Sequence, residues 1–326
     1  MLTEPDRVIV GCAGADGTGI ALRRKAALSL IGALVVTGAL GFVLVGRRSQ
    51  FAAALHSAPL ALLALAALLQ VVALLARSEA WRVCVAAAGG SVSRRVLFRA
   101  AGIGYLASIL NGSVGMAARI ASLRRAAPQS TPRVPALVAA EVPIITVEVA
   151  LAAIFSFTLI GPLGVPWWAP AIAVTAMAGV VIGLRRLSKR RAGLWAGLAV
   201  VRDEGCVRMI AFTLLAVCAQ IGRNWLLLHA IGVNVSVFDA MALLIGMFTL
   251  GQLPIGPSIG PAAAVLILGA HGIAATAAAG VLLAVSGMAG SFCYATWAIA
   301  DGVVARRRAA RSDVTRVPVA AALGSG

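Results

Sequence analysis

Residues 100–119 read AAGIGYLASILNGSVGMAAR, an apolar stretch that is broken near its end by NGSVG at 111–115. A helix needs about 20 residues to span about 30 Å of hydrocarbon, so the stretch is just long enough to cross a membrane. Glycine supplies unusual backbone dihedrals, which makes the break a place where a helix can turn back. Arg119, Arg124 and Arg125 follow the break, and their side of the membrane decides between crossing and turning.

The composition of the whole chain indicates a membrane protein. Of its 326 residues, 61% are apolar and only 12% are charged. A soluble domain carries about 25% charged residues, so most of this surface must face lipid and a soluble enzyme is excluded. The net charge is +17, but the basic residues lie in clusters between apolar runs. This is the pattern of membrane topology, and we expect no nucleic-acid partner.

Eight apolar stretches are candidate membrane segments. Their approximate ranges are 26–46, 51–76, 100–118, 136–160, 167–184, 207–231, 239–270 and 276–304. The first is too long for the core of a cleaved signal peptide, so we expect a retained anchor. Residues 1–25 are predicted to be a flexible cytoplasmic tail, and residues 305–326 a basic, disordered cytoplasmic tail. The membrane domain is therefore expected at 26–304.

The distribution of basic residues predicts that the third and seventh segments are re-entrant. If every segment crossed, Arg119 and the basic loop at 185–191 would lie outside. If these two segments turn back, only Arg47 and Arg48 lie outside and Arg223 lies within a span. The fold is then an all-α polytopic membrane protein with about six full spans, two re-entrant helical segments and both termini cytoplasmic. Irregular backbone at membrane depth must pack in protein or line a cavity, so a cavity is implied.

The membrane domain divides into two halves of similar length, 26–160 and 167–304. Each half is predicted to contain two spans, a re-entrant segment and a further span. Three crossings in the first half invert the second, which is the arrangement of transporters built from inverted repeats. No residue-level repeat is evident, so inverted repeats and a coincidence of length both stay open.

Ionisable residues within the spans are the main candidates for function, because a charge in lipid is costly. Glu141 and Glu148 lie seven residues apart and share one helix face. Arg223 and Asn224 lie inside the sixth segment. One interpretation is a carboxylate–guanidinium pair that locks the bundle. The other is that Arg223 holds a lipid phosphate while one of the glutamates balances it.

Two further sites carry polar residues: Arg119, which has two interpretations, and the RSEAWR stretch, for which an interfacial role is expected. Arg119 follows the NGSVG break and either faces an anionic headgroup or extends to the membrane interface. The stretch RSEAWR at 77–82 is predicted at the inner end of the second segment, where Trp81 fits an interfacial anchor.

The sequence holds no pattern of catalytic or metal-binding residues. The five cysteines and three histidines are scattered, without the spacing of a zinc site, so no metal and no cofactor are expected. No nucleophile elbow, zinc-protease helix or phosphate-binding loop with its lysine is present. We therefore predict that the protein is not an enzyme.

Three motifs resemble the flippase-like transmembrane domain of lysylphosphatidylglycerol synthetases. They are RSEAWR at 77–82, NGSVGMAAR at 111–119 and LPIGPSIGPAAAVLIL at 253–268. The resemblance covers residues 26–304 and implies lipid translocation in the cytoplasmic membrane. It also leads us to expect a stand-alone member, without the soluble aminoacyl-transfer domain of the full-length synthetases.

The chain departs from the family pattern at its acidic positions. In the family's Gly-Glu-x-x-Arg arrangement, Gly115 and Arg119 match, but Met116 occupies the place of the glutamate. The second motif is Pro-x-x-Pro-Gly-Gly-x-Gly-x-x-Glu. Pro254, Pro257 and Gly260 match this arrangement. Ser258 stands where the pair of glycines is expected, and Ala263 or Ala264 replaces the acid. These departures put the family's usual substrate in doubt.

The leading hypothesis is a flippase-like protein that translocates or binds an anionic phospholipid or a lipid-linked headgroup. The residues expected to bind the headgroup are Asn111, Gly115, Arg119, Glu141, Glu148, Arg223, Asn224, Pro254, Pro257 and Gly260. The alternative is a non-transporting membrane subunit that scaffolds a lipid- or glycan-modifying enzyme, which would then be a protein partner. In both cases membrane lipids, anionic ones first, are the expected partners.

Overall fold

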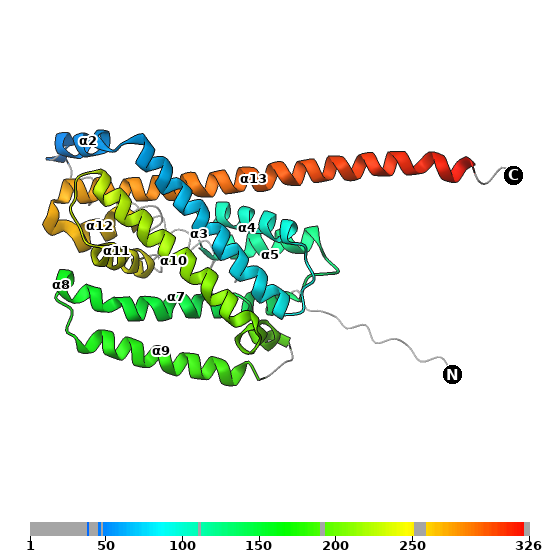
Figure 1. Ribbon diagram of the computed structural model, residues 1–326, viewed down its shortest axis with the longest axis horizontal. Coiled ribbons are helices and arrows are strands. Elements are labelled where there is room, and N and C mark those ends of the chain that lie inside the picture. The colour runs from blue at the N-terminus through cyan, green and yellow to red at the C-terminus, as the bar shows by residue number, and fades with distance from the viewer. Residues whose placement is uncertain are drawn as a thin grey trace, which may run out of the picture.

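The computed structural model describes residues 38, 45–46, 48–109, 112–189, 193–250 and 259–322. Every regular element in these ranges is a helix (Figure 1). Most of the predicted span at 26–46 lies outside the described residues, so the sixth full span stays a prediction. The all-α polytopic fold itself is confirmed.

Five helical runs in the described part are long and apolar enough to cross a membrane. They are Leu60–Ala87 (α3), Val134–Leu163 (α6 to α8), Trp168–Leu187 (α9), Gly205–Ala230 (α10) and Ile273–Ala305 within α13. The second run consists of α6 (Val134–Ala139), α7 (Val142–Phe155), a 3₁₀ turn (Ser156–Leu159) and α8 (Ile160–Leu163). The five runs alternate in direction along the bundle, as successive crossings require (Figure 1).

The second span lies later in the sequence than the predicted 51–76. A short helix, α2 (Arg48–Ser57), ends before Pro59, and α3 starts after this proline and continues to Ala87. Pro59 has an extended backbone and sets the helix start, because proline is tolerated there but not in a helix interior. The RSEAWR stretch continues the helix because its charged groups find partners inside the bundle.

The third apolar segment turns back as a hairpin of two helices, α4 (Arg94–Ser108) and α5 (Gly112–Ala126). Each has 15 residues and is about 22 Å long, too short to span the hydrocarbon. The two helices touch through glycine. A methyl group on Gly104 would lie 2.7 Å from Cβ of Arg119, and one on Gly115 would lie 2.6 Å from Cβ of Ser108.

The seventh segment also turns back, as α11 (Val237–Leu250) and α12 (Ile259–Leu268). Its packing again depends on small residues. A methyl group on Gly260 would lie 2.7 Å from the carbonyl oxygen of Gly280 on α13 (Ile273–Ala322), and one on Gly280 would clash with the backbone of Pro261. A 3₁₀ turn, Gly269–His271, then leads into α13.

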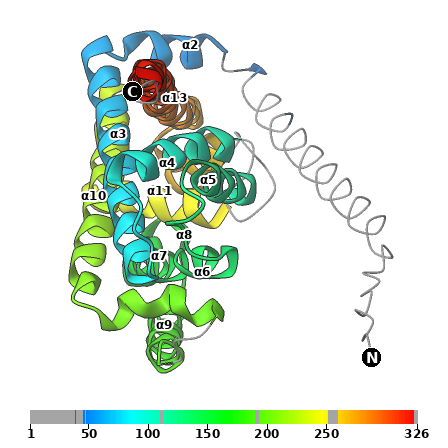
Figure 2. The ribbon, with the colours of Figure 1, turned by 90° about the vertical axis from the view of Figure 1, so that its right-hand side faces the viewer.

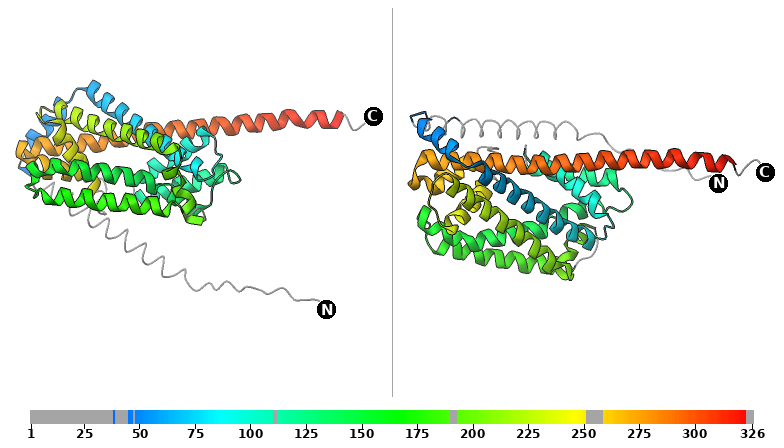
Figure 3. Two further views of the ribbon diagram at one scale, coloured as in Figure 1. Left: turned by 60° about the horizontal axis from the view of Figure 1, so that its bottom comes forward. Right: turned by 45° about the horizontal axis from the view of Figure 1, so that its top comes forward.

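The two hairpins enter the bundle from opposite ends (Figures 1 and 3). The α4–α5 hairpin lies at the end where α3 and α9 finish, and the α11–α12 hairpin lies at the end where α10 finishes and α13 begins. This is the placement that inverted halves require. The division into halves at 26–160 and 167–304 stays a prediction.

Each hairpin is anchored in its own apolar core. The first core surrounds Trp81, Leu97 and Leu123 and joins α3, α4, α5 and α6 with a 3₁₀ stretch, Gly193–Arg202. The second surrounds Leu243 and Leu268 and joins the helices α10, α11, α12 and α13. The apolar residues on the outer faces of α3, α9 and α10 remain exposed, as helices facing lipid require.

The disordered tail expected at 305–326 stays a prediction, and the described part of this segment, to Ala322, belongs to helix α13. Helix α13 continues without a break to Ala322 and projects beyond the bundle (Figure 1). Residues 305–311 consist of alanine and arginine, which are among the best helix formers, and propagation from an existing helix needs no new nucleus. The span therefore extends into the basic segment as a helix.

Candidate functional site

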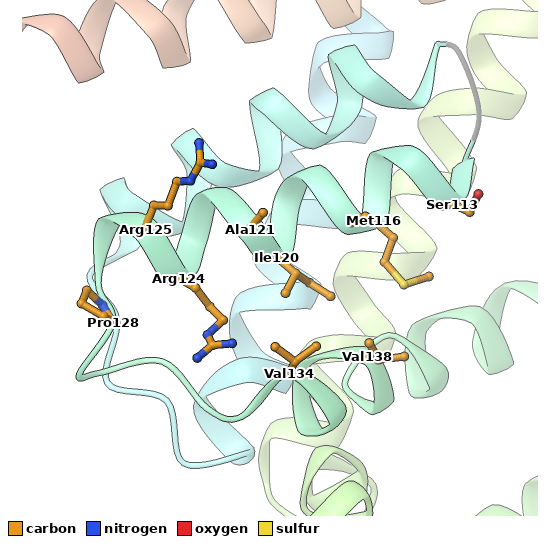
Figure 4. Close-up of a pocket in the computed structure, with 10 residues that line it drawn as sticks. Ser113, Met116, Ile120, Ala121, Arg124, Arg125, Pro128, Val134 and Val138 are labelled. Carbon is orange, nitrogen blue, oxygen red and sulfur yellow. The ribbon is translucent and has the colours of Figure 1, made fainter. Parts of the chain in front are cut away.

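A groove of about 550 Å³ lies between α5 and α6 (Figure 4). Its lining residues are Ser113, Met116, Ala117, Ile120, Ala121, Arg124, Arg125, Pro128, Val134 and Val138. Those on α5 recur every three or four residues, so they form one stripe of that helix. The groove is apolar along most of its length and basic at one end.

The basic end of the groove carries Arg124 and Arg125, both exposed, in the last turn of α5. The Arg124 side chain extends toward α6, and Arg125 extends from the other side of α5 at the same level (Figure 4). Among the ion pairs of the described residues, none includes either arginine. Two guanidinium groups thus lie at the end of an apolar groove, and no carboxylate of the described residues pairs with them.

A buried ion pair lies beside this groove. Arg119 on α5 donates to Glu141, which sits at the break between α6 and α7, and both residues are less than 10% exposed. The guanidinium carbon of Arg119 also lies 4.2 Å from the centre of the Trp81 ring, at cation–π distance. Trp81 is fully buried by these contacts, so the expectation of an interfacial anchor is wrong. Its ring instead holds the arginine of the first hairpin.

A second ion pair lies deeper in the bundle. Arg77, one turn before Trp81 on α3, donates to Glu148 on α7. The two side chains line a small internal cavity of about 50 Å³, together with Gln220 of α10 and apolar residues of α7, α10 and α11. Seven residues of helix separate Glu141 from Glu148, so the two ion pairs follow one another about 10 Å apart along α7.

Arg223 on α10 forms the third basic position and has no carboxylate in the described part of the chain. It donates to the amide oxygen of Gln70 on α3 and, at 3.2 Å, to that of Asn224. Arg223 is 5% exposed and Asn224 is fully buried. Within the described ranges, neither the Nε of Arg223 nor the Nδ2 of Asn224 has a hydrogen-bond partner. Two buried donors are therefore left open to an acceptor.

One face of α3 connects these positions. Gln70, Arg77 and Trp81 follow each other at intervals of seven and four residues, so they point to the same side of the helix. The partners come from α5, α7 and α10. The result is a row of guanidinium groups, Arg119, Arg77 and Arg223, that runs from the end bearing the α4–α5 hairpin into the middle of the bundle.

The structure gathers five of the expected site residues around this row: Arg119, Glu141, Glu148, Arg223 and Asn224. It does not pair Arg223 with a glutamate, because each glutamate already has an arginine of its own. Arg77 was not among the expected site residues. Its interval of seven residues from Gln70, another polar residue in an apolar helix, is the signal that could have identified it.

The remaining expected residues have other positions. Gly115 and Gly260 are buried where the hairpin helices make close contacts, so they serve packing. Asn111, Pro254 and Pro257 lie outside the described residues. Within those residues, no group of three His, Cys, Asp or Glu side chains is placed to hold a metal ion.

Comparison with protein families identifies one match. The model of the family described as the lysylphosphatidylglycerol synthase TM region matches residues 29–296. This range includes both hairpins, the groove between α5 and α6, and the three arginines of the row. No curated protein and no solved structure matches the chain.

Proposed function

Because the chain belongs to the lysylphosphatidylglycerol synthase TM-region family, we propose that it binds an anionic phospholipid and carries the headgroup across the cytoplasmic membrane. The observation that supports this proposal most directly is the α5–α6 groove, with its apolar walls and two arginines at one end that form no ion pair with the described residues. An anionic phospholipid has the complementary order, with a charged head above apolar chains. The protein moves this lipid and does not alter it covalently.

The sign of the charge in the groove favours an anionic headgroup. The lining holds Arg124 and Arg125 and no acidic residue. A phosphate that enters hydrocarbon without a partner loses several kcal/mol of solvation, and an arginine compensates it through two parallel hydrogen bonds. Met116 also lines the groove, at the position where the family pattern has a glutamate. A neutral side chain there leaves the attraction for an anion undiminished.

The row of arginines offers further binding positions for the headgroup. Arg119 lies five residues before Arg124 on α5, which is about 7.5 Å along the helix. A phosphate that moves inward would replace the carboxylate of Glu141 at its arginine and then the carboxylate of Glu148 at its arginine. It would next reach the open donors of Arg223 and Asn224. Each guanidinium keeps an anion through the exchange, and the carboxylate that the phosphate displaces must stay within reach of the next arginine of the row, because a buried carboxylate without a partner costs about 3–5 kcal/mol.

The orientation in the membrane follows from the same charges. The end of the bundle with the α4–α5 hairpin carries most of the basic residues, whereas α2, which begins at Arg48, lies at the opposite end (Figure 1). We assign the basic end to the cytoplasm by the positive-inside rule. The α5–α6 groove then opens at the level of the cytoplasmic headgroups, and lipid enters from that leaflet.

A translocation assay in proteoliposomes tests the proposal. Fluorescent phosphatidylglycerol in the inner leaflet becomes accessible to an impermeant quencher only after it crosses. We expect the Arg124→Gln/Arg125→Gln variant to slow translocation at least tenfold, because a hydrogen bond to a charged group contributes about 1.5–3 kcal/mol and 1.36 kcal/mol corresponds to tenfold in rate. Arg185→Gln/Arg186→Gln is the matched control, since these two arginines occupy the last turn of α9.

Two results would count against the proposal. Wild-type rates equal to those of empty vesicles, for several anionic lipids, would remove translocation. Equal slowing by the α5 and α9 variants would show that general surface charge matters and the groove does not. Copurification of a lipid-modifying enzyme at fixed stoichiometry, with no translocation, would support the scaffold function instead.

A further inference from the structure

We infer that a second groove, between α3, α4 and α13, is the binding site of a resident anionic phospholipid that the protein does not transport. The groove has a volume of about 490 Å³. Its lining residues are Val71, Leu75, Arg94, Arg95, Phe98, Cys293, Tyr294 and Trp297. The inference does not depend on the proposed translocation, because α4 faces this groove whereas α5 faces the other.

The walls of the groove suit an acyl chain. Val71 and Leu75 lie one turn apart on α3, and Cys293 and Trp297 lie one turn apart on α13, so two membrane-spanning helices form apolar walls of the groove. The Trp297 ring stacks on Tyr294, with ring centres 5.7 Å apart. Leu75 is 37% exposed and Trp297 is 43% exposed. In the membrane these surfaces face hydrocarbon.

The end of the groove is basic. Arg94 and Arg95 occupy the first turn of α4, and their side chains are 70% and 68% exposed. Arg94 contacts Glu79 and lies with its guanidinium carbon 5.3 Å from the centre of the Phe98 ring. This contact holds the arginine above the apolar wall, at the position where a phosphate would follow an acyl chain.

The carboxylates near this end do not balance the arginines. Glu79 also binds Arg82, at 2.5 Å. Asp301 binds Arg99 at 2.5 Å and lies 3.8 Å from Arg95, which is at the limit of an ion pair. Four guanidinium groups therefore share two carboxylates, and two positive charges remain for an anion. A zwitterionic or neutral lipid would leave this excess uncompensated.

The position in the bundle favours a lipid over a protein as the occupant. Figure 2 shows α3, α4 and α13 side by side on one flank, with α5 and α6 on another. The arginines lie at the basic end of the bundle, level with the headgroups, and the apolar walls extend from there into the membrane. A phospholipid has this order of charge and hydrocarbon along its length, whereas a membrane-spanning helix would meet two arginines at its side.

Tryptophan quenching by brominated lipids tests the inference with a control in the same chain. Nanodiscs contain phosphatidylcholine and increasing fractions of dibrominated phosphatidylglycerol or dibrominated phosphatidylcholine. The difference between wild type and Trp297→Phe isolates the fluorescence of Trp297. Trp225 on α10 is the matched control, because it is 38% exposed and lines neither groove. The same subtraction with Trp225→Phe isolates its signal.

We expect brominated phosphatidylglycerol to half-quench Trp297 at a mole fraction roughly fivefold or more below that of brominated phosphatidylcholine, since each uncompensated basic residue attracts anionic lipid by about 1 kcal/mol. Trp225 should show no such preference. Arg94→Gln/Arg95→Gln should abolish the preference at Trp297 and leave translocation unchanged. The variant is expected to fold, because Glu79 keeps Arg82 and Asp301 keeps Arg99.

Two outcomes would overturn the inference, and both can be read from the Trp297 signal without the Arg94→Gln/Arg95→Gln variant. Equal quenching of Trp297 by the two lipids would mean that the groove contains only bulk lipid. Protection of Trp297 from both lipids, together with dimeric mass in light scattering, would mean that a second copy of the chain covers the groove. Neither outcome bears on the translocation assay, which probes the α5–α6 groove.

Discussion

The two hairpins are built alike but carry different charges. Both enter from an end of the bundle, both turn back, and both pack through glycine against a neighbouring helix. The α4–α5 hairpin carries Arg119, Arg124 and Arg125 on its returning helix, whereas α12, with the sequence IGPAAAVLIL, carries no charge. The shared backbone design thus holds two chemically different surfaces. Similar topology does not imply that the two hairpins do the same work.

The difference indicates how the work is divided. The first hairpin presents cations to the groove and to the buried row, so it is suited to binding a headgroup. The second hairpin contributes close apolar packing against α10 and α13, around Leu243 and Leu268. Of the three arginines of the row, Arg223 lies in the middle of the bundle, and it belongs to the span α10 and not to a hairpin.

The largest effect is expected where the first hairpin depends on charge. Arg119→Met removes the cation beside Glu141 and leaves a buried carboxylate without its partner. Breaking a buried pair in this way costs about 3–5 kcal/mol, so the melting temperature in detergent should fall markedly. Adding Glu141→Leu should restore most of the loss, because the uncompensated charge is then gone. Single and double variants with equal melting temperatures would show that the pair does not hold the hairpin.

An intermediate effect is expected where the two hairpins are alike. Gly115→Ala would press on Ser108 and on the carbonyl oxygen of Gly104, and Gly280→Ala would press on the backbone of Pro261. Overpacking of this kind costs about 1–3 kcal/mol, so both variants should melt at lower temperature by similar amounts. Gly179→Ala on α9 is the control, since a methyl group there meets nothing within 4 Å.

A large loss of stability in only one of the two variants, Gly115→Ala or Gly280→Ala, would show that the hairpins are not structurally equivalent. A gain of stability in Gly179→Ala, in the direction of the higher helix propensity of alanine, would show that the losses come from contact and not from the helix itself.

The architecture of the described part could be predicted from the sequence, because hydropathy indicates the membrane segments and the positions of the basic residues indicate which segments cross. The position of Arg119 after the NGSVG break favoured a turn over a crossing, and the structure has a hairpin there. The start of the second span could not be placed as well. Residues 51–55 read FAAAL and extend the apolar run that follows toward the N-terminus, and the backbone restriction at Pro59 separates α2 from α3.

The candidate site was predictable in its members but not in its pairing. Glu141, Glu148 and Arg223 stand out as charges within apolar segments, which sequence reveals. The partners depend on how the helices rotate about their axes, and this follows from packing across the whole bundle. Arg77 and Trp81 illustrate the point, because both lie near the end of a span, where an interfacial position is as compatible with the sequence as the buried one.

The smallest effect on stability is expected at Arg223, because its partners are neutral amides, whereas Arg119 pairs with a buried carboxylate. Arg223→Met leaves no carboxylate behind among the described residues, so it removes an uncompensated buried charge together with two hydrogen bonds to neutral amides. Hydrogen bonds from a charged donor contribute about 1.5–3 kcal/mol each, and the relief of burying a charge offsets them. The free energy of unfolding should therefore change by no more than about 1 kcal/mol, while translocation of phosphatidylglycerol falls.

Arg223→Lys separates charge from geometry at this position. Lysine keeps the positive charge but cannot reach Gln70 and Asn224 through one planar group, so it should restore translocation only in part. If Arg223→Met instead lowers the melting temperature as far as Arg119→Met does, a carboxylate must lie against Arg223 in the membrane. The open donors of Arg223 and Asn224 would then already be filled by the protein, and a lipid phosphate would have no reason to stop there.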